Sequence, residues 1–151
     1  MMSGMDERVE NYLGTHHAAA MITLRADGTP HAVRCGIALV DGKLWSSGVP
    51  QRIRTGHLRR DPRATLFVYG SDQADRFSYL TLECTVTILE GPDAAEFNRR
   101  LFTVMQAGLD RPPDTLYWEG TPRTIDEFMR IMAEEHRLIY EFEVTRSYGL
   151  F

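Results

Sequence analysis

The residues best suited to binding chemistry gather in one short stretch of the chain. Two adjacent hydroxyls, Ser46 and Ser47, are followed by Gly48, and five arginines with a single aspartate then lie between residues 52 and 63. Backbone N–H groups at the start of a helix and guanidinium forks are groups that bind phosphate oxygens. This order of residue types predicts an anion site at a turn from a strand into a helix.

Arg52 and Arg54 are the arginines closest to this turn. In a regular helix their side chains would point about 200° apart, given 3.6 residues per turn. They can bind one phosphate together only if Arg52 still lies in the loop before the helix. The alternative is a solvated basic helix whose arginines pair with acidic residues of the surface.

The elements that must position this segment are mostly β-strands. Alternating apolar residues and two Asp-Gly turns predict six strands, over residues 18–25, 31–39, 44–48, 64–69, 79–90 and 138–146. Helical signals cover residues 5–12, 50–61, 92–108 and the stretch from 124 onward. Ser3 is a candidate N-cap of the first helix, Thr124 and Glu127 form a capping box, and residues 109–118 have the pattern of an irregular connection. The pattern favours a mostly β fold with inserted helices, a closed or half-closed antiparallel barrel, with a two-layer α+β sandwich as the alternative.

Length and composition point to a single domain over residues 1–151. The chain is 43% hydrophobic and 25% charged, which is typical of a globular protein. It contains no run of about 20 apolar residues, and the first fifteen residues carry charges where a signal peptide needs an apolar segment. We therefore expect a soluble cytoplasmic protein with no membrane partner. The net charge of −4 argues against a nucleic-acid partner.

Several other residues have side chains that can take part in chemistry. Cys35 and Cys84 lie in strand-like patterns and are expected to be buried free thiols. The five histidines lack the spacing of metal ligands, so no metal site is predicted. Tyr117 and Trp118 follow a Pro-Pro loop and are candidates for a substrate wall or a dimer contact.

Three stretches together carry a resemblance to a known family: TLRADGTPHAV at 23–33, DGKLWSS at 41–47, and the arginine-rich segment 52–63, which ends in LRRDPR. In this order they closely resemble the pyridoxamine 5'-phosphate oxidase-like superfamily. More narrowly, the chain is similar to the small oxidoreductases of that group that use coenzyme F420 or FMN. The resemblance spans about residues 5–90 and implies a six-stranded antiparallel split β-barrel of the FMN-binding type.

The resemblance also implies a homodimer with two cofactor sites in the clefts between subunits. Coenzyme F420 is the expected cofactor, with FMN as the alternative. Arg52 and Arg54 would hold the cofactor phosphate, with Ile53 between them where many relatives carry a second basic residue. Ser46 and Ser47 would contact the phosphate or the ribityl chain. The strand expected to lie against the ring comprises Val33, Arg34, Cys35 and Gly36.

The function that the resemblance implies is hydride transfer from reduced F420 to a small unsaturated or conjugated substrate. An FMN-dependent reductase or oxidase of the same superfamily is one alternative, and a non-catalytic binder or carrier of a planar cofactor is another. Such a ring performs the redox chemistry itself, so the protein needs neither a catalytic triad nor a metal cluster. No catalytic residue is identified from the sequence.

Overall fold

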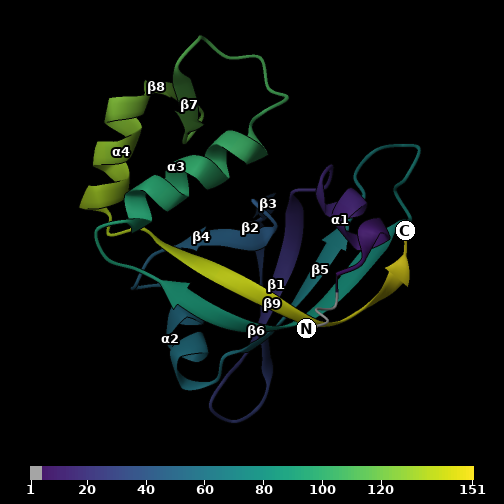
Figure 1. The fold of residues 1–151 in the computed structure, drawn as a ribbon. Coiled ribbons are helices and arrows are strands. Elements are labelled where there is room, and N and C mark those ends of the chain that lie inside the picture. The colour runs from purple at the N-terminus through teal and green to yellow at the C-terminus, as the bar shows by residue number, and fades with distance from the viewer. Residues whose placement is uncertain (1–4) are drawn as a thin grey trace.

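The computed structural model describes residues 5–151, and its main feature is one curled antiparallel sheet (Figure 1). The sheet has seven strands in the order β2-β1-β5-β6-β9-β4-β3. Their bounds are β1 Ala18–Leu24, β2 Pro30–Gly36, β3 Ala38–Val40, β4 Lys43–Gly48, β5 Arg63–Tyr69, β6 Tyr79–Leu89 and β9 Leu138–Leu150. The predicted mostly β split barrel with inserted helices is confirmed.

The predicted count of six strands is wrong by one, because the expected strand 31–39 is divided at Ile37. Before this residue β2 pairs with β1, and after it β3 pairs with β4. The Ile37 amide donates to the His17 carbonyl at 2.9 Å, and the Ser46 hydroxyl donates to the Gly36 carbonyl at 2.7 Å. One continuous segment thus forms both edge strands of the curled sheet and joins them at Ile37.

The described chain has four helices, of which the first precedes β1 and the other three are inserted between strands; their bounds are α1 Glu7–Leu13, α2 Ile53–Arg60, α3 Ala94–Met105 and α4 Ile125–Glu134. Asp6 is the N-cap of α1 and accepts from the Val9 amide at 2.9 Å. The proposed cap Ser3 lies outside the described residues. The predicted capping box of α4, formed by Thr124 and Glu127, is confirmed.

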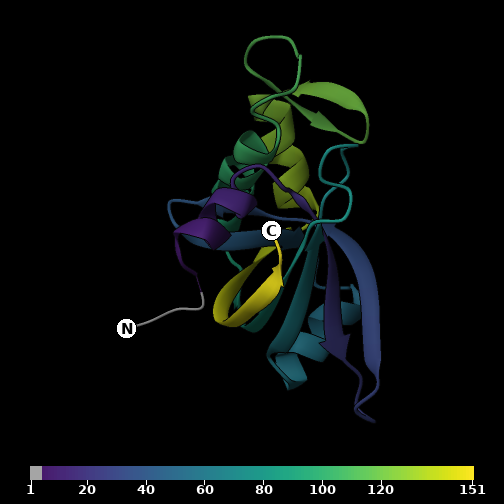
Figure 2. The ribbon, with the colours of Figure 1, turned by 90° about the vertical axis from the view of Figure 1, so that its right-hand side faces the viewer.

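The region between α3 and α4 differs from the prediction. Residues expected to form only an irregular connection contribute β7 Thr115–Trp118, which pairs with β8 Thr121–Thr124. The turn between them places Glu119 and Gly120 at positive φ, as a tight hairpin requires. Figures 1 and 2 show α3, α4 and this hairpin gathered over one end of the sheet.

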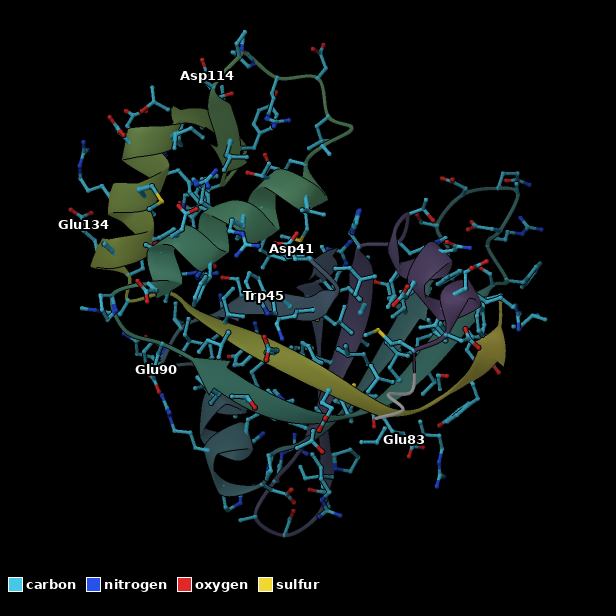
Figure 3. All side chains as sticks on the ribbon, in the orientation of Figure 1. Asp41, Trp45, Glu83, Glu90, Asp114 and Glu134 are labelled. Carbon is cyan, nitrogen blue, oxygen red and sulfur yellow. The ribbon has the colours of Figure 1, made fainter. Side chains whose placement is uncertain are left out.

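Side chains fill the barrel in the alternating pattern that the sequence predicts. On β6, Leu80, Leu82, Cys84 and Val86 point into the barrel and are buried. Cys35 and Cys84 are buried free thiols, as expected. A second cluster, which includes Trp45, packs between the sheet and α3, and Figure 3 shows this tryptophan on the side of the sheet that faces the helix. Within residues 5–151, no helix is long and apolar enough to span a membrane.

Candidate functional site

The turn from β4 into α2 is fixed by close packing on Tyr140 of β9. A Cβ atom on Gly48 would lie 2.3 Å from the Tyr140 hydroxyl oxygen, so only glycine fits there. The same hydroxyl donates to Thr55 Oγ1 at 2.5 Å, and Thr55 donates in turn to the Val49 carbonyl at 2.8 Å. The start of α2 is therefore anchored to the sheet on both sides of the turn.

Arg52 is the N-cap of α2 and has extended backbone angles, with φ −65° and ψ 140°. It therefore lies outside the helix, which is the condition under which it and Arg54 can reach one anion. Arg54 is the second residue of the helix and is only 8% exposed. The two side chains thus differ in exposure, since Arg52 lies at the surface.

Arg54 lacks the hydrogen bonds that a buried guanidinium requires. Its Nη2 donates to the Ser47 carbonyl at 3.4 Å, and its Nε is buried with no acceptor among the described residues. The guanidinium carbon lies 5.5 Å from the centroid of the Tyr140 ring. Leaving such a donor unsatisfied costs about 1 to 3 kcal/mol, and more for a charged group. An acceptor from outside this chain is therefore the natural partner of the Arg54 Nε.

A third guanidinium, that of Arg137 just before β9, joins this site. Its side chain is 10% exposed, and its guanidinium carbon lies 4.9 Å from the centroid of the Trp118 ring. Its Nε donates to Ser47 Oγ at 3.3 Å, and its Nη1 lies 3.4 Å from a carboxylate oxygen of Glu135. Contacts with Trp118, Ser47 and Glu135 therefore hold the guanidinium in place.

The positive charges of the three arginines act on one another. Burial lowers the pKa of Arg137, and the positive charges of Arg52 and Arg54 lower it further, while the Glu135 carboxylate opposes them. Within the described part of the chain, no carboxylate forms an ion pair with Arg52 or Arg54. The neighbouring charges of Arg52 and Arg54, which have no carboxylate partner there, favour the binding of an anion.

The two serines position the walls of the site. Ser46 is 1% exposed, and its hydroxyl donates a hydrogen bond to the Gly36 carbonyl. The Ser47 hydroxyl donates to Asn98 Oδ1 of α3 at 2.5 Å. Asn98 is fully buried, and its amide donates to the Ala94 carbonyl at 2.9 Å. Both hydroxyls therefore connect strands and helices around the site.

These groups surround a cavity of about 200 Å³, which we call the anion cavity; it is lined by Cys35, Gly36, Ser46, Ser47, Arg54, Phe102, Met105 and Arg137. Five of the nine sequence-predicted residues are brought together here. Four are not: Val33 packs on the barrel core, Arg34 and Arg52 are exposed, and Ile53 is 66% exposed.

The apolar wall of the anion cavity comes from β2 and α3. Burial raises the pKa of the Cys35 thiol, although the nearby Ser46 hydroxyl and Arg54 charge oppose the shift. Cys35 is therefore a neutral, apolar neighbour. A Cβ on Gly36 would meet the Met105 sulfur at 3.0 Å, so the glycine lets α3 approach the strand closely.

Sequence reasoning missed Phe102, Met105 and Arg137. The two α3 residues belong to an apolar stripe whose spacing indicates only packing. Arg137 has no neighbouring motif, and its position at the site depends on the path of the chain through α3 and α4. The candidate residue Trp118 lies near the site, since it packs on Phe102 with ring centroids 5.5 Å apart.

His57 lies one turn after Arg54 in α2 and faces β1. It contacts Thr23 through its Nδ1 at 2.9 Å and lies edge-on to His31, with ring centroids 5.1 Å apart. Burial lowers its pKa, and the neighbouring His31, Arg60 and Arg25 lower it further. His57 does not line the anion cavity.

Comparison with known proteins identifies the family and supports the fold. A family model described as pyridoxamine 5'-phosphate oxidase matches residues 5–128. No curated protein matches the sequence significantly. The barrel and its helices recur in solved structures at low sequence identity, which establishes a shared fold.

Three of these structures illustrate the likeness. A conserved hypothetical protein of Mycobacterium tuberculosis shares 20% identity with a TM-score of 0.70, over 98% of this chain and 86% of its own. A protein titled F420 reductase shares 19% identity with a TM-score of 0.66, over 95% of this chain and 98% of its own. An FAD-binding protein of Mesorhizobium loti shares 16% identity with a TM-score of 0.62, over 96% and 94% of the two chains.

Proposed function

Because the chain belongs to the pyridoxamine 5'-phosphate oxidase family, we propose that it is a cytoplasmic oxidoreductase that binds a phosphate-bearing flavin-like cofactor. The specific cofactor that we propose is coenzyme F420, with FMN as the competing possibility. The reaction would be hydride transfer to a small unsaturated or conjugated substrate. Neighbouring structures titled F420 reductase and FAD-binding protein support a flavin-like cofactor in general.

The observation that carries this proposal is that Arg54 has a buried N–H donor without an acceptor in residues 5–151. Its buried Nε has no acceptor within the described chain, while Arg137 and Arg52 add positive charge nearby. A phosphate has enough oxygens to accept from several guanidinium nitrogens at once. Each hydrogen bond to a charged group contributes about 1.5 to 3 kcal/mol. The donor set of this cavity therefore fits the tail of a phosphorylated cofactor.

The residues of the chain and the cofactor have separate tasks in this proposal. When bound, the flavin or deazaflavin ring supplies the hydride chemistry. Arg54 and Arg137 bind and orient the phosphate, and Ser47 keeps Arg137 aimed at it through the 3.3 Å hydrogen bond. Phe102 and Met105 exclude water from one side of the cavity, which strengthens these charged contacts.

The size of the anion cavity supports a homodimeric site. Its volume of about 200 Å³ falls below the 300 to 1,000 Å³ typical of cavities that hold whole cofactors. It is large enough for a phosphate and the atoms next to it. We propose that the ring lies beyond this cavity, along the β2 residues Val33 to Gly36, and that a second copy of the chain supplies the remaining wall.

The outer face of the sheet offers a surface for that second copy. Strand register places Arg34, Ala20, Phe67, Thr81 and Tyr148 in one row across five strands. Phe67 is 38% exposed and Tyr148 is 49% exposed. Since exposed aromatic residues favour protein interfaces, a partner covering this row would also reach Arg34 on β2.

The proposed cofactor is tested by equilibrium titration of the purified chain with F420 and, separately, with FMN. We expect saturable F420 binding in the micromolar range and oxidation of the reduced cofactor when a conjugated acceptor is added. Saturable FMN binding without F420 binding would select the FMN alternative. Binding without turnover of any acceptor would indicate a carrier, and binding of neither cofactor would refute the proposal.

The proposed dimer is tested by sedimentation of Phe67→Asp beside Phe77→Asp. Phe77 is more exposed, at 76%, and lies in the loop between β5 and β6, so it is not a member of the row on the sheet. We expect the wild type and Phe77→Asp to sediment as dimers and Phe67→Asp to dissociate. A monomeric wild type, or dimers in all three proteins, would contradict this interface.

A further inference from the structure

A second, larger cavity lies on the other side of Arg137. Its volume is about 490 Å³, within the range of small-molecule sites, and it is lined by Pro50, Glu90, Gly91, Pro92, Ala95, Met132, Ala133, His136 and Arg137. Arg137 lines both this cavity and the anion cavity. We call the second one the α4 cavity, since the end of α4 forms one of its walls.

The polar groups of the α4 cavity are unevenly distributed. His136 and Arg137 are consecutive residues of the lining, and Glu90 lies on the connection between β6 and α3 (Figure 3). Both carboxylate oxygens of Glu90 accept from Arg59, each at 2.9 Å. The negative charge of Glu90 is thus neutralised outside the cavity. The Glu135 carboxylate lies 3.4 Å from Nη1 of Arg137, and Nη2 of the same guanidinium has no acceptor within residues 5–151.

The backbone at His136 supports a role for its side chain. This residue has φ +53° and directly follows Glu135, the C-cap of α4, with its amide donating to the Ala133 carbonyl at 3.1 Å. Glycine is the usual residue at this position of a helix end, because a side chain in the left-handed region costs about 1 to 2 kcal/mol. Strain of this kind points to a function for the residue that bears it. The residue in this backbone conformation, His136, is one of those that line the α4 cavity.

The remaining wall is apolar, made by Pro50, Pro92, Ala95, Met132 and Ala133. We propose that the α4 cavity binds a small monocarboxylate with an apolar body. The carboxylate would accept from Arg137 and His136, and the body would lie against the prolines and Met132. The site suits a ligand with a single negative charge, because its side-chain donors are one guanidinium and one imidazole. The anion cavity, by contrast, is lined by two guanidinium groups, those of Arg54 and Arg137.

The experiment uses the full-length protein and phenylacetate as the probe, with calorimetry and Trp118 fluorescence as readouts. Trp118 reports on the site because its ring lies 4.9 Å from the guanidinium carbon of Arg137. Acetate lacks the apolar body, and 2-phenylethanol lacks the charge. We expect phenylacetate to bind about tenfold or more tightly than either control, since both kinds of contact are then made.

Two variants locate the binding. His136→Gly removes the imidazole and relieves the left-handed strain, so it leaves the fold intact. Ala133→Phe adds a ring at a position that lines the cavity, and Glu134→Phe adds the same ring at the next position of α4, which is also exposed but outside the lining. We expect phenylacetate affinity to fall about tenfold in the first two variants and to stay unchanged in Glu134→Phe.

The proposal is overturned if phenylacetate binds no better than acetate, or if both cavity variants keep wild-type affinity. Titration of the same variants with F420 and FMN separates this inference from the proposed function. His136→Gly and Ala133→Phe leave the residues of the anion cavity in place, so cofactor affinity stays at the wild-type level. Phenylacetate binding in a chain that binds neither cofactor would uphold the α4 cavity and refute the proposed function.

Discussion

The two halves of the arginine-rich segment have opposite surroundings. At its C-terminal half, Arg59 pairs with Glu90 and Arg63 pairs with Asp61, both within 2.9 Å. At its N-terminal half, Arg52 and Arg54 have no carboxylate partner in the described chain, and Arg54 is buried with an unsatisfied Nε. Arginines that look alike in the sequence therefore differ in their surroundings and in what they can bind. The paired half stabilises the surface, and the unpaired half has positive charge available for a ligand.

The largest expected effect is the loss of cofactor affinity when Arg54, in the unpaired half of the segment, is replaced. Arg54→Ala should weaken cofactor binding by about 1.5 to 3 kcal/mol, which is roughly 10- to 150-fold. Arg63→Ala, which removes an equal charge from the paired half, should leave affinity within about twofold. Calorimetric titration of both variants makes the comparison, and melting curves check that each is folded. Equal losses in the two variants would show that only the overall charge matters.

The second prediction concerns the packing that holds the unpaired half in place. Gly48→Ala forces a Cβ to 2.3 Å from the Tyr140 hydroxyl, so we expect a loss of about 1 to 3 kcal/mol in the free energy of unfolding. Gly56→Ala is the matched control within α2, where a Cβ meets nothing within 4 Å. Denaturant unfolding should show it unchanged or more stable by about 0.5 to 1 kcal/mol. Similar stabilities for the two variants would refute the anchoring of α2 on Tyr140.

The third prediction sharpens the role of Arg137. Arg137→Gln keeps a donor within reach of Ser47 but removes the positive charge, so cofactor affinity should fall by about 0.5 to 1.5 kcal/mol. Arg59→Gln is the control, because it removes a charge from the paired half. Fluorescence of Trp118, which lies against the Arg137 guanidinium, should change in the first variant alone. Unchanged affinity in Arg137→Gln would remove this residue from the site.

The smallest effect is a titration in the paired half. The Arg63 side chain and backbone hold the pKa of Asp61 at about 2, below its ordinary 3.8. The folded state therefore binds this proton less readily than the unfolded state. Any stabilisation from the pair is present above pH 3.8 and is lost as the pH falls through about 2. Carboxyl NMR should show the Asp61 pKa rising toward 3.8 in Arg63→Ala, and an unshifted pKa would contradict the pairing.

Much of the fold was predictable because its signals are local. The alternation of apolar residues along β6, the Asp41-Gly42 turn and the capping box at Thr124 each depend on neighbouring residues, and all three appear in the structure. The division of a strand at Ile37 was missed because it depends on which strands pair across the barrel. The β7–β8 hairpin was missed because its four-residue strands are too short to show a period.

The candidate site was only partly predictable, for a similar reason. The sequence identified Ser46, Ser47 and Arg54 because strand, turn and helix follow one another directly. It could not distinguish Arg54 from Arg59, because the Glu90 that pairs with Arg59 comes from another element of the fold. It could not find Arg137 either, since only the three-dimensional path of the chain brings that residue to Ser47.

The most direct test of the central claim is a crystal structure of the protein with F420 or FMN bound. We predict that a phosphate oxygen accepts from the Nε of Arg54, with Arg137 within hydrogen-bond distance of the same phosphate. A phosphate bound instead at Arg59 and Arg63, or at a place away from the start of α2, would contradict the assignment of the anion cavity.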